Sequence, residues 1–297
     1  MLFKKSTWQH LRIPFSFYLM PIYCFAIGTS GVFIWDTALL SFLAIHLFLY
    51  PASNGYNSYF DKDEESIGGL EKPPPVDKEL YYAALLFDAI AVLLGFLISW
   101  KFALMMLVYG LVSKAYSSDK IRLKKYPVIG WLVVCLFQGA FTYAMVKQAH
   151  LGLLFSELLL WEHLFPAILS TAMLLGSYPM TQIYQHKEDA KRGDLTISRI
   201  LGIKGTFLFT GIFFGGTTGG FIYYFSTQFG QLAALFFPIF LLPVLLFFGQ
   251  WFLKVLKDET KADFKLTMQL NLISAVCLNA FFISLLFGIQ LGIFKVG

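Results

Sequence analysis

Long apolar segments alternate with short polar segments along the whole chain. A helix needs about 20 mostly apolar residues to cross the hydrocarbon core of a bilayer. Nine segments approach that length and predict nine transmembrane helices. Their approximate bounds are Pro14–Ile34, Thr37–Asn57, Leu80–Trp100, Phe102–Tyr116, Pro127–Val146, His163–Gln185, Ile203–Ser226, Gln231–Leu256 and Thr267–Phe294. The short fourth segment follows the third after little more than Lys101, which predicts a tight hairpin.

The composition excludes an ordinary soluble domain. Of the 297 residues, 57% are hydrophobic and only 14% are charged, whereas soluble domains average about 45–50% apolar and about 25% charged residues. No loop between the predicted helices is long enough for a separate soluble domain. We therefore expect a single helical domain over residues 1–297.

The basic residues indicate how the helices are oriented. Of the 23 Lys and Arg residues, 20 lie in the N-terminal segment or near the loops after even-numbered helices. Only Lys101, Lys147 and Lys295 lie on the other side. The positive-inside rule then predicts a cytoplasmic N-terminus and a C-terminus outside. We expect a multi-pass protein of a bacterial cytoplasmic membrane, and this explanation of the net charge of +5 requires no nucleic-acid partner.

Two groups of acidic and amide side chains follow predicted helices on the cytoplasmic side. Asn57, Asp61 and Glu65 end the second helix at a spacing that would share one face if the helix continues. Gln185 and Asp189 do the same after the sixth helix. Like charges on one face repel unless a cation lies among them, and a few hard oxygen ligands suit Mg²⁺ bound to a diphosphate. The alternative is that each group is simply a solvated helix end. That explanation is weaker for two such groups on the same side than it would be for one.

A basic loop lies on the same side, between the fourth and fifth predicted helices. It contains Arg122, Lys124 and Lys125 within residues 116–127. Taken alone, this loop would be explained by the positive-inside signal or by contact with anionic headgroups. Beside two acidic groups, it is the expected anion-binding half of a metal–diphosphate site.

In these three segments the chain resembles the UbiA superfamily of intramembrane prenyltransferases. The family has nine helices, an Asn-Asp-x-x-Asp-x-x-x-Asp motif after the second and an Asp-x-x-x-Asp motif after the sixth. Here Asn57 and Asp61 match the first motif, and Asp189 matches the second. The chain departs from the pattern at three positions, where Ser58 and Gln185 replace Asp and Glu65 replaces Asp. Lys72 belongs to a basic-Pro element after the first motif, as in the family.

The resemblance implies an all-α fold of nine transmembrane helices around a central cavity that opens to the cytoplasm. It also implies Mg²⁺-dependent transfer of a prenyl group from an isoprenoid diphosphate to an aromatic or otherwise lipophilic acceptor within the lipid membrane. Asp61, Asp189 and Asn57 are then the catalytic residues. The implied metal ligands are Asn57, Asp61, Glu65 and Asp189, and the implied diphosphate-binding residues are Lys72, Arg122, Lys124 and Lys125.

Two other functions remain open at this point. A terpene cyclase on the same scaffold would keep the ionisation of the diphosphate but would need no acceptor, and the altered motifs are compatible with it. A non-catalytic lipid-binding or transport protein with a degenerate site is the alternative from a different class. Release of pyrophosphate, together with the identity of the products, separates the three functions.

Overall fold

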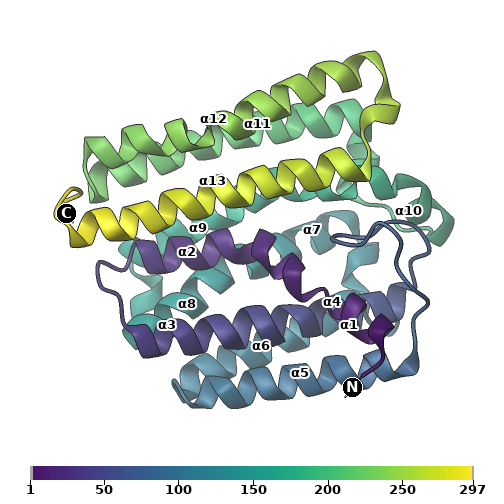
Figure 1. The fold of residues 1–297 in the computed structure, drawn as a ribbon, viewed down its shortest axis with the longest axis horizontal. Coiled ribbons are helices and arrows are strands. Elements are labelled where there is room, and N and C mark those ends of the chain that lie inside the picture. The colour runs from purple at the N-terminus through teal and green to yellow at the C-terminus, as the bar shows by residue number, and fades with distance from the viewer. Residues whose placement is uncertain (1–2, 296–297) are drawn as a thin grey trace.

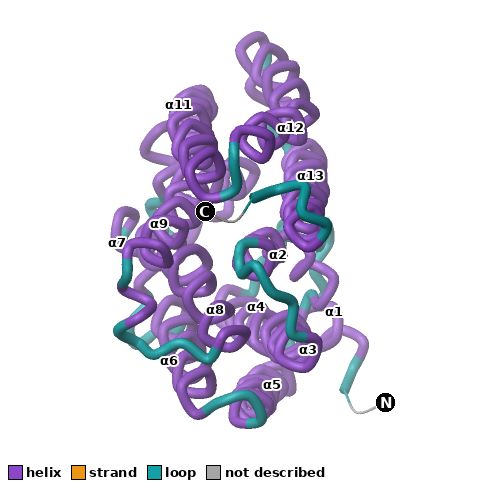
Figure 2. The backbone as a smooth tube through the Cα atoms, turned by 90° about the vertical axis from the view of Figure 1, so that its left-hand side faces the viewer, coloured by secondary structure: helices purple, strands orange, loops and turns teal. Residues whose placement is uncertain are grey.

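The computed structural model describes residues 3–295, which form an almost entirely helical bundle. The helices run side by side, and the loops around α10 gather at the end opposite the last described residues (Figure 1). Seen from the side, α11, α12 and α13 lie on one flank and α5 on the other (Figure 2). Within the described residues no strand is present, and the only β-type pairing is an isolated bridge between Ile67 and Leu70. This architecture confirms the predicted fold class.

Several predicted spans consist of more than one helical element. The elements are α1 (Lys5–Leu11), η1 (Ile13–Leu19), α2 (Met20–Gly28), α3 (Trp35–Phe42), η2 (Leu43–Leu49), α4 (Tyr50–Asp61), α5 (Lys78–Phe96), α6 (Trp100–Ser117), η3 (Leu123–Lys125), α7 (Pro127–Leu136), η4 (Phe137–Phe141), α8 (Thr142–Leu151), η5 (Glu157–Leu159), α9 (Trp161–Ser177), η6 (Tyr178–Gln185), α10 (His186–Arg192), α11 (Ile197–Gln228), α12 (Gln231–Lys257), η7 (Glu259–Lys261) and α13 (Phe264–Gln290). The segments η2 and η4 are π-helical, and the other η segments are 3₁₀ helices.

Eight helical segments of the described chain are long and apolar enough to cross a membrane. They correspond to eight of the nine predicted spans. The remaining span is α6, an 18-residue helix that carries Lys101 and Lys114. As predicted, α5 and α6 form a hairpin: they pack against each other, and the Ser99 hydroxyl caps α6 by accepting a hydrogen bond from the Phe102 N–H at 3.0 Å. Gly95 allows this close approach, because a Cβ there would lie 2.9 Å from the Ala103 Cα.

Packed aromatic rings fill the interior away from α10. Phe25, Phe225 and Phe281 are at most 1% exposed. The Phe25 ring lies 4.9 Å from the Phe282 ring, and the Phe225 ring lies 5.0 Å from the Phe281 ring. Ring pairs at these separations stabilise by packing beyond simple burial. These contacts pack α2 and α11 against α13. The charged side chains described below lie at the other end of the bundle.

Candidate functional site

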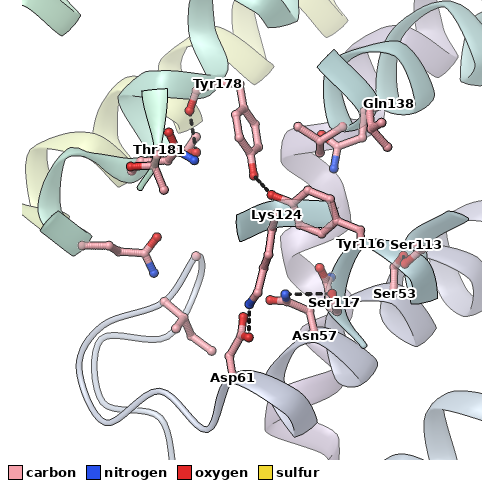
Figure 3. A pocket seen from close by; sticks show the side chains of 18 of the residues that line it. Ser53, Asn57, Asp61, Ser113, Tyr116, Ser117, Lys124, Gln138, Tyr178 and Thr181 are labelled. Atoms are coloured by element: carbon pink, nitrogen blue, oxygen red, sulfur yellow. Dashed lines mark hydrogen bonds and ion pairs between the residues drawn. The ribbon is translucent and has the colours of Figure 1, made fainter. Parts of the chain in front are cut away.

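A cavity of about 270 Å³ lies at the end of the bundle that carries α10. We call it the site cavity. Its walls come from η1, α4, α6, η3, α7, η4, η6 and α10, together with the loop after α4. Figure 3 shows the side chains of Asn57, Asp61 and Lys124 converging below the phenol groups of Tyr116 and Tyr178. The structure therefore brings the first acidic segment and the basic loop together, and Asp189 of the second acidic segment lines the same cavity.

Four carboxylates line the site cavity: Asp61, Asp63, Asp189 and Asp194. Burial, followed by the neighbouring charge of Asp61, raises the pKa of Asp63 to about 6. A raised pKa of this kind means that the ionised carboxylates are crowded in a poorly solvated place. A divalent cation bound among these carboxylates would offset their mutual repulsion and compensate for their poor solvation.

Basic side chains pair with these carboxylates. Lys124 forms an ion pair with Asp61 (Figure 3). The Arg192 Nη1 lies 2.7 Å from the Asp63 Oδ1, and the Arg122 Nη2 lies 2.9 Å from the Asp194 Oδ2. Lys124 and Arg192 line the site cavity, whereas Arg122 lies outside its lining and its predicted role in binding diphosphate stays a prediction.

Arg12 is a cavity residue that the sequence patterns did not single out. It stands between α1 and η1 with a φ of 47° and is 9% exposed. Its guanidinium donates to the carbonyl oxygens of Gly68 at 3.0 Å and of Asn54 at 3.3 Å, and its buried Nε has no partner among the described residues. From the sequence alone, Arg12 is only one of the 20 basic residues predicted on the cytoplasmic side. Nothing in the neighbouring sequence indicates that the chain turns inward at this position.

The loop after α4 closes over the cavity. Ile67 and Leu70 exchange two backbone hydrogen bonds of 2.9 and 2.8 Å around a turn at Gly68 and Gly69. Gly69 has a φ of +83°, and a Cβ on Gly68 would lie 2.8 Å from the Phe15 ring. Only glycine fits both positions without a shift of Phe15. The turn thereby brings the Gly68 carbonyl to Arg12.

The 3₁₀ geometry of η6 explains how the segment before the second acidic group faces the cavity. In a 3₁₀ helix, residues three apart lie above one another. Tyr178, Thr181 and Tyr184 follow this spacing and all line the site cavity, as do Gln182 and Gln185. The Tyr178 hydroxyl lies 3.0 Å from the Tyr116 hydroxyl.

Asn57 is oriented by α6. Its Nδ2 donates to the Ser117 Oγ at 3.0 Å (Figure 3), which leaves its Oδ1 available toward the cavity. Gln185 also lines the cavity, and its Nε2 donates to the Ser66 carbonyl at 3.3 Å. Both amides can therefore offer a neutral oxygen to a cation.

Some predicted site residues lie elsewhere. The helix does not continue to Glu65 as the i, i+8 spacing assumed, because α4 ends at Asp61 and Lys62 adopts a left-handed conformation with a φ of 50°. Glu65 is exposed and its Oε1 lies 3.4 Å from the Lys191 Nζ. Lys72 and Lys125 are exposed and outside the cavity lining, and their roles stay predictions.

One position within the first motif and one within the second acidic group are buried without lining the cavity. Ser58 is 1% exposed, and its Oγ has no hydrogen-bond partner among the described residues. Glu188 is 8% exposed and its Oε1 lies 3.4 Å from the Arg192 Nη2. The additional acidic groups that line the cavity are thus Asp63 and Asp194, and Glu188 is not among them.

The donor set of the cavity has the chemistry that Mg²⁺ prefers. Mg²⁺ binds oxygen ligands, keeps several waters and is often held by one or two carboxylates plus substrate phosphates. Asp61, Asp189 and Asn57 supply such oxygens. Within residues 3–295 no group of three or more His, Cys, Asp or Glu side chains is arranged to hold a metal by itself. The residues therefore fit a cation that arrives with a diphosphate better than a closed protein cage.

A second cavity, of about 250 Å³, adjoins the site cavity. The two share Phe15, Leu19, Gln138, Tyr178 and Thr181 in their linings. The rest of the second cavity is built mainly by apolar side chains of α2, α9, α11, α12 and α13. A charged compartment thus borders an apolar one.

The fold and the site define a class of protein: a polytopic helical membrane protein with an acidic and basic cavity at one end of its bundle. The chain belongs to the UbiA prenyltransferase family, whose family model matches residues 18–273. None of the curated proteins matches the sequence significantly.

Solved structures of similar fold cover nearly the whole chain. A UbiA homologue from Archaeoglobus fulgidus bound to GPP and Mg²⁺ is 16% identical with a TM-score of 0.65, over 95% of this chain and 99% of that one. An apo UbiA homologue from Aeropyrum pernix K1 is 17% identical with a TM-score of 0.68, over 91% and 97%. A digeranylgeranylglyceryl phosphate synthase is 16% identical with a TM-score of 0.59, over 95% and 98%. At these identities the likeness establishes the shared fold.

Proposed function

We propose that this protein is a Mg²⁺-dependent enzyme that transfers a prenyl group from an isoprenoid diphosphate to a lipophilic acceptor. The observation that carries the proposal is the site cavity, where carboxylates from both acidic segments face basic side chains of separate elements. Membership of the family supports the same chemistry. So do the A. fulgidus structures bound to GPP or DMAPP with Mg²⁺.

Each group of side chains has a distinct role in this proposal. Asp61 and Asp189, with the Asn57 Oδ1, hold the cation. When bound, Mg²⁺ supplies neutralisation of the negative charge that develops on the leaving diphosphate. Lys124 and Arg192 release their carboxylates and bind the diphosphate oxygens, because these acceptors carry more charge than one carboxylate. Lys124 and Arg192 therefore alternate between carboxylate and diphosphate partners.

Aromatic and apolar walls surround the reacting carbon. As its bond to the diphosphate oxygen breaks, the allylic carbon becomes positively charged and must be kept from water. Phe15, Tyr178 and Phe137 line the cavity and can face that charge with their rings. The inner wall is formed by Tyr109 and by valines of α6 and α7, and it accommodates the prenyl chain. An acceptor nucleophile then attacks the carbon and loses a proton.

The same proposal includes the placement of the protein. We place the site cavity and the N-terminus on the cytoplasmic side of a bacterial cytoplasmic membrane, following the 20 basic residues on that side. We also propose that residues 1–297 form one domain, because both acidic segments contribute to one cavity.

The test uses the purified full-length chain in lipid nanodiscs with Mg²⁺ and GPP or DMAPP. We expect pyrophosphate release that depends on Mg²⁺ and, when membrane lipid extract is added, a prenylated product. A cyclised product without any acceptor would assign the chain to the terpene cyclases. Absence of both release and binding of the diphosphate would favour the lipid-binding alternative.

A further inference from the structure

Two polar side chains of α13 face the second cavity without a partner. Asn271 and Ser274 are one helical turn apart and both line this cavity. Within the part of the chain that the structure describes, neither side chain makes a hydrogen bond to protein. The other Ser and Thr hydroxyl groups of the lining behave differently, whereas the Tyr18 hydroxyl and the Gln138 amide at the edge of the cavity are also without a protein hydrogen bond among the described residues. The hydroxyl groups of Ser177, Thr181 and Thr210 donate to backbone carbonyls at 2.9, 2.7 and 2.7 Å.

The free amide and hydroxyl groups restrict what can occupy the cavity. A hydrocarbon chain would remove them from water and offer no hydrogen bond in return, which is unfavourable for both. A molecule with an apolar body and a hydroxyl or carbonyl group would satisfy them. Ligand sites commonly combine an apolar wall with a few polar groups that fix orientation. The second cavity has this composition.

We propose that the second cavity binds the acceptor, as a lipophilic molecule whose hydroxyl or carbonyl group is held by Asn271 and Ser274. The identification of this molecule as the acceptor rests on the function proposed above. The acceptor extends toward Gln138, Tyr178 and Thr181, which border both cavities. The prenyl chain keeps the separate apolar wall of the site cavity, so the two substrates meet at this junction.

The cavity wall offers a glycine at which a side chain can be added with no close neighbour at its Cβ. Gly215 of α11 lines the second cavity, and a Cβ there would meet no atom within 4 Å. Gly219 lies one turn further along the same helix with equally open space, but outside the cavity lining. Gly215→Leu and Gly219→Leu are therefore a matched pair of variants.

The experiment is photolabelling of the full-length protein in nanodiscs. The probe is 4-nonylphenol with a diazirine in its tail, and the comparison probe is the same molecule with hydrogen in place of the hydroxyl. We expect the phenol to label peptides of α9 and α13 about fivefold more than the deoxy probe, the ratio that one ordinary hydrogen bond produces. Asn271→Leu should bring the ratio close to one. Asn279→Leu is the control: Asn279 lies on the same helix, is 4% exposed, and its unpartnered amide lies outside the cavity lining.

Gly215→Leu should suppress labelling by both probes, whereas Gly219→Leu should leave it unchanged. Equal labelling of the wild type by the two probes, or a ratio that survives Asn271→Leu, would overturn the proposal. So would displacement of the phenol by a non-hydrolysable GPP analogue with Mg²⁺, because the prenyl chain would then occupy this cavity. Labelling requires no turnover, so its outcome is distinguishable from a failure of the proposed prenyl transfer.

Discussion

Asp61→Asn tests the site most directly, because it removes one negative charge while preserving the size of the side chain. The Asp61 side chain is 10% exposed and its partner Lys124 is 11% exposed, so their ion pair is mostly shielded from water. A hydrogen bond to a charged group contributes about 1.5–3 kcal/mol to stability. We expect the free energy of unfolding to fall by an amount of that order.

The loss of activity should exceed the loss of stability. Asp61 is a proposed ligand of the cation as well as the partner of Lys124. Removing a single group that stabilises charge in a transition state typically costs about 10²–10³-fold in turnover. We expect at least that reduction in pyrophosphate release from GPP, measured with Mg²⁺ in nanodiscs beside a thermal unfolding curve of each variant.

A double-mutant cycle separates the two effects. Lys124→Met alone should also destabilise, whereas the double variant Asp61→Asn/Lys124→Met should unfold closer to the wild type than the two single effects predict. Its turnover should stay as low as that of Asp61→Asn. Asp258→Ala is the control and should be nearly silent in turnover, because this carboxylate lies in an exposed turn, where it accepts from Thr260 and lies 4.0 Å from the Lys261 Nζ. Wild-type pyrophosphate release by Asp61→Asn would refute the proposed site.

Three further predictions address other parts of the molecule. Gln185→Asp adds a carboxylate to the cavity lining and should tighten Mg²⁺ binding in calorimetric titrations without diphosphate; Ser58→Asp, at a buried position outside the lining, should instead lower stability by about 1–3 kcal/mol. Unchanged Mg²⁺ affinity in Gln185→Asp would remove that position from the metal site. Arg12→Gln should raise the KM for GPP about tenfold or more through loss of a charged donor, and an unchanged KM would leave Arg12 with a purely structural role. In a background without the native cysteines, a cysteine at the exposed Lys125 should be labelled only from the cytoplasm and one at the 51% exposed Leu154 only from outside. Labelling of both from the same side would contradict the proposed topology.

Hydrophobic length by itself determined the class of fold and most of the helices. Spans such as Gln231–Lys257 are recognisable from sequence because the bilayer requires about 20 apolar residues whatever surrounds them. The α5–α6 hairpin was predictable for a related reason, since Lys101 leaves no room for a longer connection. The motifs around Asn57 and Asp189 also indicated the family correctly.

The composition of the site was decided by the tertiary structure. Spacing placed Glu65 on a helical face, but α4 ends at Asp61 because Lys62 turns into the left-handed region, and the loop then brings Asp63 into the cavity instead. Arg12 and Arg192 lie far apart in sequence, and both reach the cavity only because η1 and α10 meet the end of α4.

The sequence thus determined which segments enter the membrane and which segments carry charge, because burial in lipid depends on local composition. It did not determine which of the charged side chains share a cavity. That depends on where helices end, on a 3₁₀ segment whose Tyr178 and Gln185 both line the site cavity, and on the turn that brings Gly68 to Arg12. These features arise from contacts between distant elements, and no local pattern encodes such contacts.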